Sequence, residues 1–136
     1  MDVNTIERMD ILLVNFSKGI GSEQNGTRYC VVVSNNKANK YSTILEVIPF
    51  TSQQKRLLPT HLDVAGFGLT KQSTLLAEQV TTISKMRVIR KVGKITDEDV
   101  IKEINKKIIV SLGLIWDYTV IYIPNDIEWE TKDGIN

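Results

Sequence analysis

The sequence has few of the residues that thiol and metal chemistry require. It contains one cysteine, Cys30, and one histidine, His61, among 136 residues. Cys30 cannot form an internal disulfide, and its place in the apolar run YCVVV indicates a small buried side chain. With a single histidine, one chain cannot form an acid–base pair made of two histidines. No group of Cys, His or acidic residues has the spacing of a metal site, so we expect neither a metal nor another cofactor.

Long apolar runs and an excess of charge are also missing. No apolar run reaches the roughly 18 residues of a membrane span. The start, MDVNTIERMD, lacks the layout of a signal peptide, so we expect a cytoplasmic protein with no membrane partner. The formal net charge is only +1, from 17 basic and 16 acidic residues, which gives no general attraction to nucleic acid. Any RNA site would have to be local.

The charges that are present are unevenly placed. Residues 85–94 carry five Lys or Arg and no acid, whereas residues 117–133 carry five acids and one lysine. Each group is explained either by a solvated face or by a local binding surface. The sequence does not decide between the two.

The chain length fits one domain over residues 1–136, and short β-branched runs bounded by turn residues predict antiparallel strands in its first two thirds. Such strands favour a small β-barrel, which would remove open sheet edges. Polar loops are predicted at 18–27 and 35–41, and a glycine-rich turn at 66–68. The predicted strands are 11–16, 28–34, 42–50, 61–64, 73–80 and 92–95.

The hydrophobic period changes to that of a helix after Thr96. Thr96 is a plausible N-cap, and apolar residues then recur at helical spacing as far as Leu112. Gly113 is placed to end the helix in the left-handed conformation. Residues 114–124 predict a further strand, followed by a polar tail.

Familiar catalytic motifs are absent from this framework. There is no phosphate-binding loop of the Walker type, and GFG at 66–68 is too short for a dinucleotide fingerprint. His61 fits a structural role better than a catalytic one. Composition and spacing alone therefore indicate a mainly β domain and leave its task open.

Several segments taken together resemble the MazF/PemK family of toxin endoribonucleases. GIGSEQNGTR is followed by YCVVVSNN, NKYS and a strand ending in PFTSQ, and then by LPTH, LLAEQVTTI and VSLGL. The order covers a core at about residues 9–114 and leaves 115–136 as an extension. GSEQ with a downstream arginine is fairly specific in combination with FTSQ and AEQ, whereas any one of these tetrapeptides is weak.

The resemblance implies an SH3-like small β-barrel with a C-terminal helix, paired as a homodimer. It implies sequence-specific cleavage of single-stranded RNA without a metal, leaving 2′,3′-cyclic phosphate and 5′-hydroxyl ends. A cognate antitoxin with an acidic, partly disordered segment would be the protein partner. Single-stranded RNA suits loops on a barrel, which recognise splayed bases by their edges.

The resemblance also implies catalytic residues. Arg28 matches the family's catalytic arginine, whose planar guanidinium suits a phosphate that gains charge. Thr51 matches a threonine whose hydroxyl could bond the phosphate or orient the attacking 2′-hydroxyl. Glu23 is expected to be either the base or a base-contacting acceptor, with a solvated loop acid as the equal alternative.

Base recognition is carried over to residues whose side chains present hydrogen-bond donors and acceptors. In a strand, two neighbours such as Glu78 and Gln79 would point to opposite faces, so one of them is expected to be structural. The predicted RNA-binding residues are Ser22, Gln24, Asn35, Ser42, Gln53, Glu78 and Gln79.

The chain also departs from the family pattern. Asn25 stands where the family has a glycine, Tyr29 where a proline usually follows the arginine, and Thr81 where an arginine often follows the EQ pair. The last change removes a possible phosphate contact. Two alternatives to a nuclease stay open: a toxin on the same barrel that inhibits gyrase, and an RNA-binding barrel without catalysis.

Overall fold

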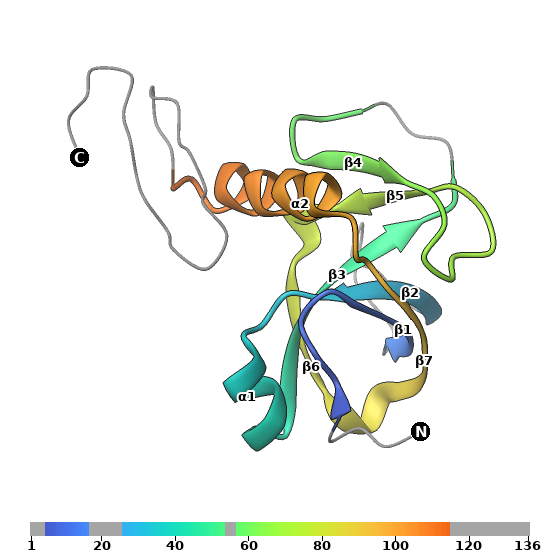
Figure 1. Ribbon diagram of the computed structural model, residues 1–136, viewed down its shortest axis with the longest axis vertical. Helices are drawn as coiled ribbons and strands as arrows, with labels where there is room; N and C mark the ends of the chain where they lie inside the picture. The colour runs from blue at the N-terminus through green and yellow to red at the C-terminus, as the bar shows by residue number, and fades with distance from the viewer. Residues whose placement is uncertain (1–4, 17–25, 54–56, 115–136) are drawn as a thin grey trace.

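The computed structural model describes residues 5–16, 26–53 and 57–114 (Figure 1). Within them, strands dominate the first part and the longer helix closes the described chain. The elements, in order, are β1 (Asp10–Phe16), β2 (Gly26–Val32), α1 (Asn36–Tyr41), β3 (Ile44–Thr51), β4 (His61–Val64), β5 (Ser73–Leu76), η2 (Ala77–Gln79), β6 (Thr81–Ser84), η3 (Lys85–Arg87), β7 (Val88–Lys94) and α2 (Glu98–Ser111).

The seven strands form one antiparallel sheet in the order β4-β5-β3-β2-β1-β7, and β6 also pairs with β3. The central strand β3 changes partners along its length. Residues 44–47 pair with β6, residues 47–49 pair with β2, and the last two residues pair with β5. The sheet therefore bends at β3. In Figure 1 α2 lies near β4 and β5, at the opposite end of the molecule from α1.

Both faces of the central strands are apolar because successive side chains of a strand point to opposite faces. On β1, Ile11 packs in one cluster with Ile48, Leu75 and Ile104, so that α2 covers this face. Its neighbour Leu12 packs in a second cluster. The core is thus divided between the two faces of the bent sheet.

Helix α2 has a defined cap at each end. The Asp97 carboxylate accepts hydrogen bonds from the backbone N–H groups of Asp99 and Val100, at 2.9 and 3.2 Å. At the other end Gly113 has φ +68°, and Leu114 N–H donates to the Ile109 carbonyl at 3.0 Å, as in a Schellman motif. The predicted stop at Gly113 is confirmed, whereas the cap is Asp97 rather than Thr96.

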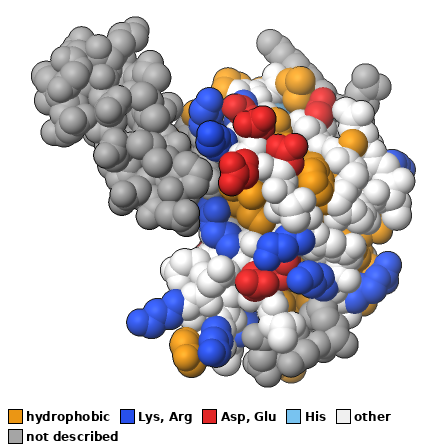
Figure 2. Space-filling view, in the orientation of Figure 1, with side chains coloured by type: hydrophobic (Ala, Val, Ile, Leu, Met, Phe, Trp, Pro, Cys, Tyr) orange, Lys and Arg blue, Asp and Glu red, His pale blue; other side chains and the backbone are white. Residues whose placement is uncertain are grey.

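The basic run at 85–94 is distributed among structural contacts. Lys85 is buried, Lys91 Nζ lies 3.1 Å from the fully buried Asp10 carboxylate, and Lys94 Nζ lies 3.2 Å from Glu7. Figure 2 shows acidic and basic side chains intermingled on the visible face rather than one continuous basic surface. These contacts indicate that Lys85, Lys91 and Lys94 stabilise the fold rather than form a binding surface.

The predicted mainly β fold with a C-terminal helix is confirmed, but three details besides the N-cap of α2 were wrong. The hydrogen-bonded strands of the described residues do not close into a ring. The sheet therefore keeps open edges, which the predicted barrel would have removed. The loop predicted at 35–41 contains α1, which the Asn35 cap supports. The strand predicted at 73–80 ends at Leu76, where the 3-10 turn η2 begins. The strand predicted at 114–124 falls almost wholly outside the described residues.

Candidate active site

Strands β2 and β3 diverge at Pro49. Residues 30–32 of β2 pair with residues 47–49 of β3, but the next two residues of β3 pair with β5 instead. Proline has no N–H to donate to a strand ladder, which favours the end of pairing at this position. The first half of β2 stays paired with β1, where Arg28 lies opposite Val14. A gap therefore opens between Arg28 on β2 and Thr51 on β3.

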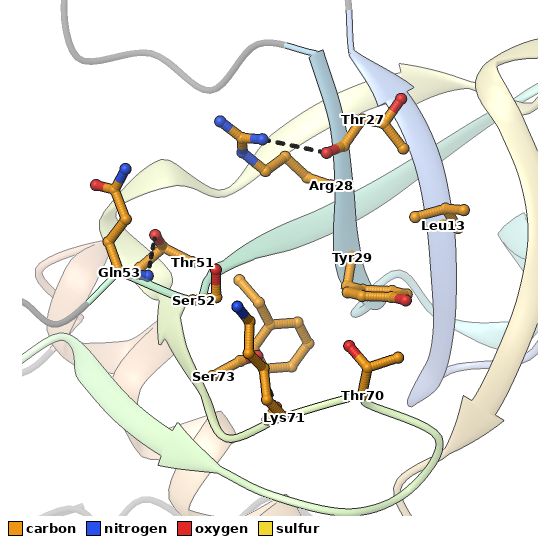
Figure 3. A pocket seen from close by; sticks show the side chains of 11 residues that line it. Leu13, Thr27, Arg28, Tyr29, Thr51, Ser52, Gln53, Thr70, Lys71 and Ser73 are labelled. Atoms are coloured by element: carbon orange, nitrogen blue, oxygen red, sulfur yellow. Dashed lines mark hydrogen bonds between the residues drawn. The ribbon is translucent and has the colours of Figure 1, made fainter.

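A pocket of about 200 Å³ occupies this gap (Figure 3). Two strands and the β4–β5 connection supply most of its wall, and β1 adds one residue. The described residues that line it include no Asp or Glu, and they carry two cations and six hydroxyl groups. The lining residues are Leu13, Thr27, Arg28, Tyr29, Phe50, Thr51, Ser52, Gln53, Thr70, Lys71 and Ser73.

Arg28 is half-buried at the edge of the pocket. Its Nη1 donates to the Thr27 carbonyl at 3.2 Å, and Figure 3 shows the guanidinium on the same side of β2 as the Thr51 hydroxyl and the Gln53 amide. A guanidinium presents five N–H donors in a planar fork, which matches the oxygens of a phosphate. The position suits Arg28 to binding an anion in the pocket.

Thr51 and Gln53 form the facing wall. Thr51 is buried, and its Oγ1 accepts a hydrogen bond from the Gln53 backbone N–H at 3.3 Å. A bond of that length holds the end of β3 in a turn without using the hydroxyl hydrogen. Of the predicted site residues that the structure describes, it brings Arg28, Thr51 and Gln53 together around one pocket.

Sequence reasoning missed the part of the wall that comes from the β4–β5 connection. Lys71 is exposed and reaches into the pocket in Figure 3, and the Ser73 hydroxyl donates to the Lys71 carbonyl at 3.1 Å. Thr70 and Ser52 add hydroxyl groups. The only sequence signal for this wall was a polar run, TKQS, before the strand predicted at 73–80.

Tyr29 also lines the pocket and packs against the core, although the sequence singled it out only as a departure from the family pattern.

Asn35 and Ser42 lie at the two ends of α1 and do not line the pocket. The Asn35 side-chain oxygen accepts from Ala38 N–H at 2.8 Å, and the Ser42 hydroxyl accepts from Ile44 N–H at 3.2 Å. Between them, the fully buried Asn39 bonds the side chain and the carbonyl of Ser34. Both predicted RNA-binding residues therefore contribute to the fold of this short helix.

Glu78 also lies outside the pocket, in a second polar cluster with Thr60 and His61. Thr60 Oγ1 donates to Glu78 Oε1 at 2.8 Å, and His61 Nε2 lies 2.9 Å from Glu78 Oε2. His61 Nδ1 accepts from the Leu58 backbone N–H at 3.2 Å. Since Nδ1 is an acceptor, Nε2 carries the hydrogen and donates to the carboxylate. The structural role predicted for His61 is confirmed.

The cluster sets the charge of Glu78. Partial burial raises the pKa of the Glu78 carboxyl, but the hydrogen bonds from His61 and Thr60 outweigh burial and hold that pKa below its ordinary value of 4.5. Glu78 is therefore ionised at neutral pH. Glu78 and Gln79 lie in the turn η2 rather than in the strand that was predicted. Among the described residues, the buried Gln79 Oε1 atom has no hydrogen-bond partner.

Three predicted residues cannot be placed. Ser22, Glu23 and Gln24 fall in the segment 17–25 before β2, outside the described residues. Within residues 5–16, 26–53 and 57–114, no three His, Cys, Asp or Glu side chains are arranged to hold a metal ion. None of the helices in these ranges combines the length and the apolar character that a membrane span needs.

Comparison with known proteins decides the family. Residues 7–112 match the PemK-like, MazF-like toxin family of type II toxin-antitoxin systems. The chain belongs to this family. The MazF/PemK match thus covers the sheet, the pocket and α2, and ends before the C-terminal extension.

Two curated members of the MazF/PemK family show the relationship in sequence. "Endoribonuclease MazF" of Staphylococcus saprophyticus is 37% identical over 112 residues, which span 80% of this chain and 92% of the relative. "Endoribonuclease EndoA" of Bacillus subtilis is 34% identical over 113 residues, which span 81% of this chain and 97% of the relative.

Solved structures show the same fold at lower identity. MazF from Deinococcus radiodurans matches with a TM-score of 0.68 and 24% identity, over 79% of this chain and 96% of the other. An endoribonuclease from a mycobacterial species, solved in complex with its cognate antitoxin, matches with a TM-score of 0.68 and 21% identity, over 82% of this chain and 99% of the other. The open, bent sheet with a C-terminal helix is the fold of MazF-type toxins.

Proposed function

We propose that this toxin is an endoribonuclease that cleaves single-stranded messenger RNA at specific sequences. The observation that carries the proposal is that Arg28 and Thr51, far apart in sequence, line one pocket. The described lining residues supply two cations and no carboxylate, which favours the binding of a phosphate. Relatives at 37% and 34% identity are named endoribonucleases, which supports RNA as the substrate.

The proposed reaction is an attack of the ribose 2′-hydroxyl on the adjacent phosphorus. The bond from the 2′-oxygen to phosphorus forms, the bond from phosphorus to the 5′-oxygen breaks, and the products carry a 2′,3′-cyclic phosphate and a 5′-hydroxyl. Charge builds on the phosphate oxygens in between. The Arg28 guanidinium would bind two of these oxygens and stabilise that charge. Arginine stays protonated to above about pH 12, so it is assigned no proton transfer.

Two other residues are proposed for the remaining steps. The Thr51 hydroxyl would donate to the phosphate or orient the attacking 2′-hydroxyl. Glu23, in the segment before β2, is proposed to accept the proton of the 2′-hydroxyl, and solvent water would deliver a proton to the leaving 5′-oxygen. No metal takes part in this scheme, since the charge on the phosphate is met by Arg28.

The proposed RNA contacts extend beyond the pocket because a strand carries several nucleotides through the site. Gln53 contacts the nucleotide in the pocket, with Ser22 and Gln24 from the preceding loop. Asn35, Ser42, Glu78 and Gln79 are proposed for flanking nucleotides. The hydrogen bonds of Asn35 and Glu78 to the protein leave this role open, because an amide and a carboxylate each form several hydrogen bonds.

The proposal includes the cellular setting of the toxin. We propose a cytoplasmic homodimer whose paired surface forms the RNA groove, with no membrane partner. The partner would be a cognate antitoxin whose acidic, partly disordered segment folds onto the toxin. The complexes of related toxins with antitoxins support this partner.

Incubating the purified protein with a long RNA in EDTA tests the proposal. Discrete fragments are expected, with 5′ ends that a polynucleotide kinase labels without prior phosphatase treatment and 3′ ends in the cyclic form. The same RNA with 2′-O-methyl groups should stay intact, since the nucleophile is blocked. Uncut RNA, or fragments with 5′-phosphates, would overturn the proposal.

A further inference from the structure

The pocket holds a second cation that the reaction above does not use. Lys71 comes from the β4–β5 connection, on the wall facing β2, and Arg28 comes from β2. Figure 3 shows the Lys71 side chain extended into the pocket from below, on the side where Ser52 and Thr51 lie. The two cations therefore approach the pocket from different walls.

The connection that carries Lys71 is fixed against β7. Phe67 and Gly68 have positive φ values of 57° and 99°, and their backbone packs directly on residues 92–93. A Cβ atom at Gly68 would come within 2.1 Å of the Val92 carbonyl oxygen, so only glycine fits. Leu69 N–H donates to the Gly66 carbonyl at 3.0 Å. Through these contacts the GFG segment sets the position of the residues that follow it.

The charges around Lys71 favour an anionic ligand. None of the pocket-lining residues is acidic, and no ion pair joins Lys71 to a carboxylate in the described part of the chain. Two cations among the described residues that line a pocket of about 200 Å³ favour the binding of an anion there. A lysine ammonium is a compact point charge on a flexible stem, which suits a phosphodiester that does not react, whereas the guanidinium fork suits the phosphate that does.

We infer that Lys71 binds the phosphate of the RNA strand next to the one held by Arg28, and so fixes the register of the strand in the pocket. The inference rests on the proposed function for its ligand. A contact to a spectator phosphate stabilises the bound RNA and the transition state equally. Lys71 should therefore affect affinity and leave the chemical step unchanged.

Lys71→Met tests the inference, with Lys71→Arg as the variant that keeps the charge. Lys37→Met is the matched control, because Lys37 is an exposed lysine on α1 that does not line the pocket. The probe for binding is a mixed-sequence 2′-O-methyl oligonucleotide, titrated at several salt concentrations. Initial rates on a long unmodified RNA give KM and kcat.

Lys71→Met should weaken binding severalfold and lower the slope of log affinity against log salt by about 0.7, the value for one phosphate of a single strand. KM should rise while kcat stays unchanged, Lys71→Arg should restore most of the affinity, and Lys37→Met should behave as wild type. A wild-type salt slope in Lys71→Met, or a loss confined to kcat, would overturn the inference and leave nuclease activity standing. If the wild type fails to cut RNA but Lys71→Met still lowers the slope, the nuclease proposal fails and the phosphate site stands.

Discussion

Two polar clusters lie on either side of β5, and they differ in how their polar atoms are used. In the cluster of Thr60, His61 and Glu78, each carboxylate oxygen and each ring nitrogen has a partner within 3.2 Å. In the pocket, Arg28 Nη1 donates to the Thr27 carbonyl at 3.2 Å and Thr51 Oγ1 accepts from the Gln53 backbone N–H at 3.3 Å, so both of these bonds run to backbone close by in sequence. The first cluster ties the start of β4 to η2, whereas the residues of the second line a pocket.

The difference separates residues that hold the fold from residues that await a ligand. A buried or half-buried polar group stabilises the fold when its bonds are satisfied within the chain. Groups that keep donor capacity at a cavity suit the binding of charge from outside. Substitutions in the two clusters should therefore act on different measurements.

Arg28→Ala should have the largest effect on activity. Loss of the guanidinium removes the charge stabilisation at the phosphate, and we expect the cleavage rate of a long RNA to fall by about 10³-fold. The melting temperature should change little, because an arginine at a strand edge contributes little to the core. Arg28→Lys is the matched variant, and it should recover only part of the rate since it lacks the planar fork.

A variant Arg28→Ala that cuts RNA at the wild-type rate would place the reacting phosphate elsewhere. If Arg28→Ala loses its activity because it no longer folds, Arg28 supports the fold instead. Circular dichroism and thermal melting of the same preparation distinguish the two results.

Thr51→Val should follow, with a loss of about 10²-fold in cleavage rate through the missing hydroxyl. Valine keeps the β-branched shape at this buried end of β3. Thr51→Ser keeps the hydroxyl and should retain much of the rate, although it leaves a small cavity. Equal rates for the valine and serine variants would remove the hydroxyl from the mechanism.

Glu78→Gln should act mainly on stability. The neutral amide weakens the bonds from Thr60 and His61, and we expect the free energy of unfolding at neutral pH to fall by about 1 kcal/mol, a modest figure because solvent screens this partly exposed carboxylate. Urea unfolding of wild type and variant measures it. Identical unfolding curves at neutral pH would show that the cluster does not support the fold.

The pH dependence of this effect has a definite sign. The pKa of Glu78 is lower in the folded chain than its ordinary value of 4.5, so its contribution is fully present above that value and is lost as the pH falls through the folded pKa. The difference in stability between wild type and Glu78→Gln should therefore shrink at successive pH values below 4.5. A difference that stays constant or grows on acidification would contradict this account.

The strands could be predicted where apolar, β-branched residues form runs, as at Asp10–Phe16 and Ile44–Thr51. Helix α1 could not, because NKANKY has no apolar period and its one buried residue, Asn39, is held by hydrogen bonds to Ser34. Strand β6 is equally hidden, since four residues, TTIS, follow a turn and pair only with the distant β3. Local pattern fails where a long-range contact supplies the stability.

The candidate site was predicted only in part for a similar reason. Arg28 and Thr51 came from the family resemblance, and nothing in their spacing brings them together. The pocket that both residues line depends on the divergence of β2 and β3 at Pro49. Lys71 enters the pocket because the GFG turn packs on β7, a contact between segments more than 20 residues apart in sequence. Sequence patterns do not report such contacts.

Substitutions of Asn35 should affect stability no more than Glu78→Gln does, but they test the comparison most directly. Asn35 was predicted to bind RNA, yet its side-chain oxygen caps α1 through Ala38 N–H at 2.8 Å. Loss of the cap should lower the free energy of unfolding by about 1 kcal/mol, whereas Asn35→Ser keeps a cap and should cost a few tenths of a kcal/mol at most.

The two variants together separate the cap from a base contact. Serine replaces the capping oxygen but removes the amide donors that would bind a base edge. If Asn35→Ser melts like wild type and binds a mixed-sequence 2′-O-methyl oligonucleotide with unchanged affinity, Asn35 belongs with the cluster that holds the fold. If stability is kept and affinity falls, the same side chain serves both purposes, and the division between the two kinds of polar residue fails at this position.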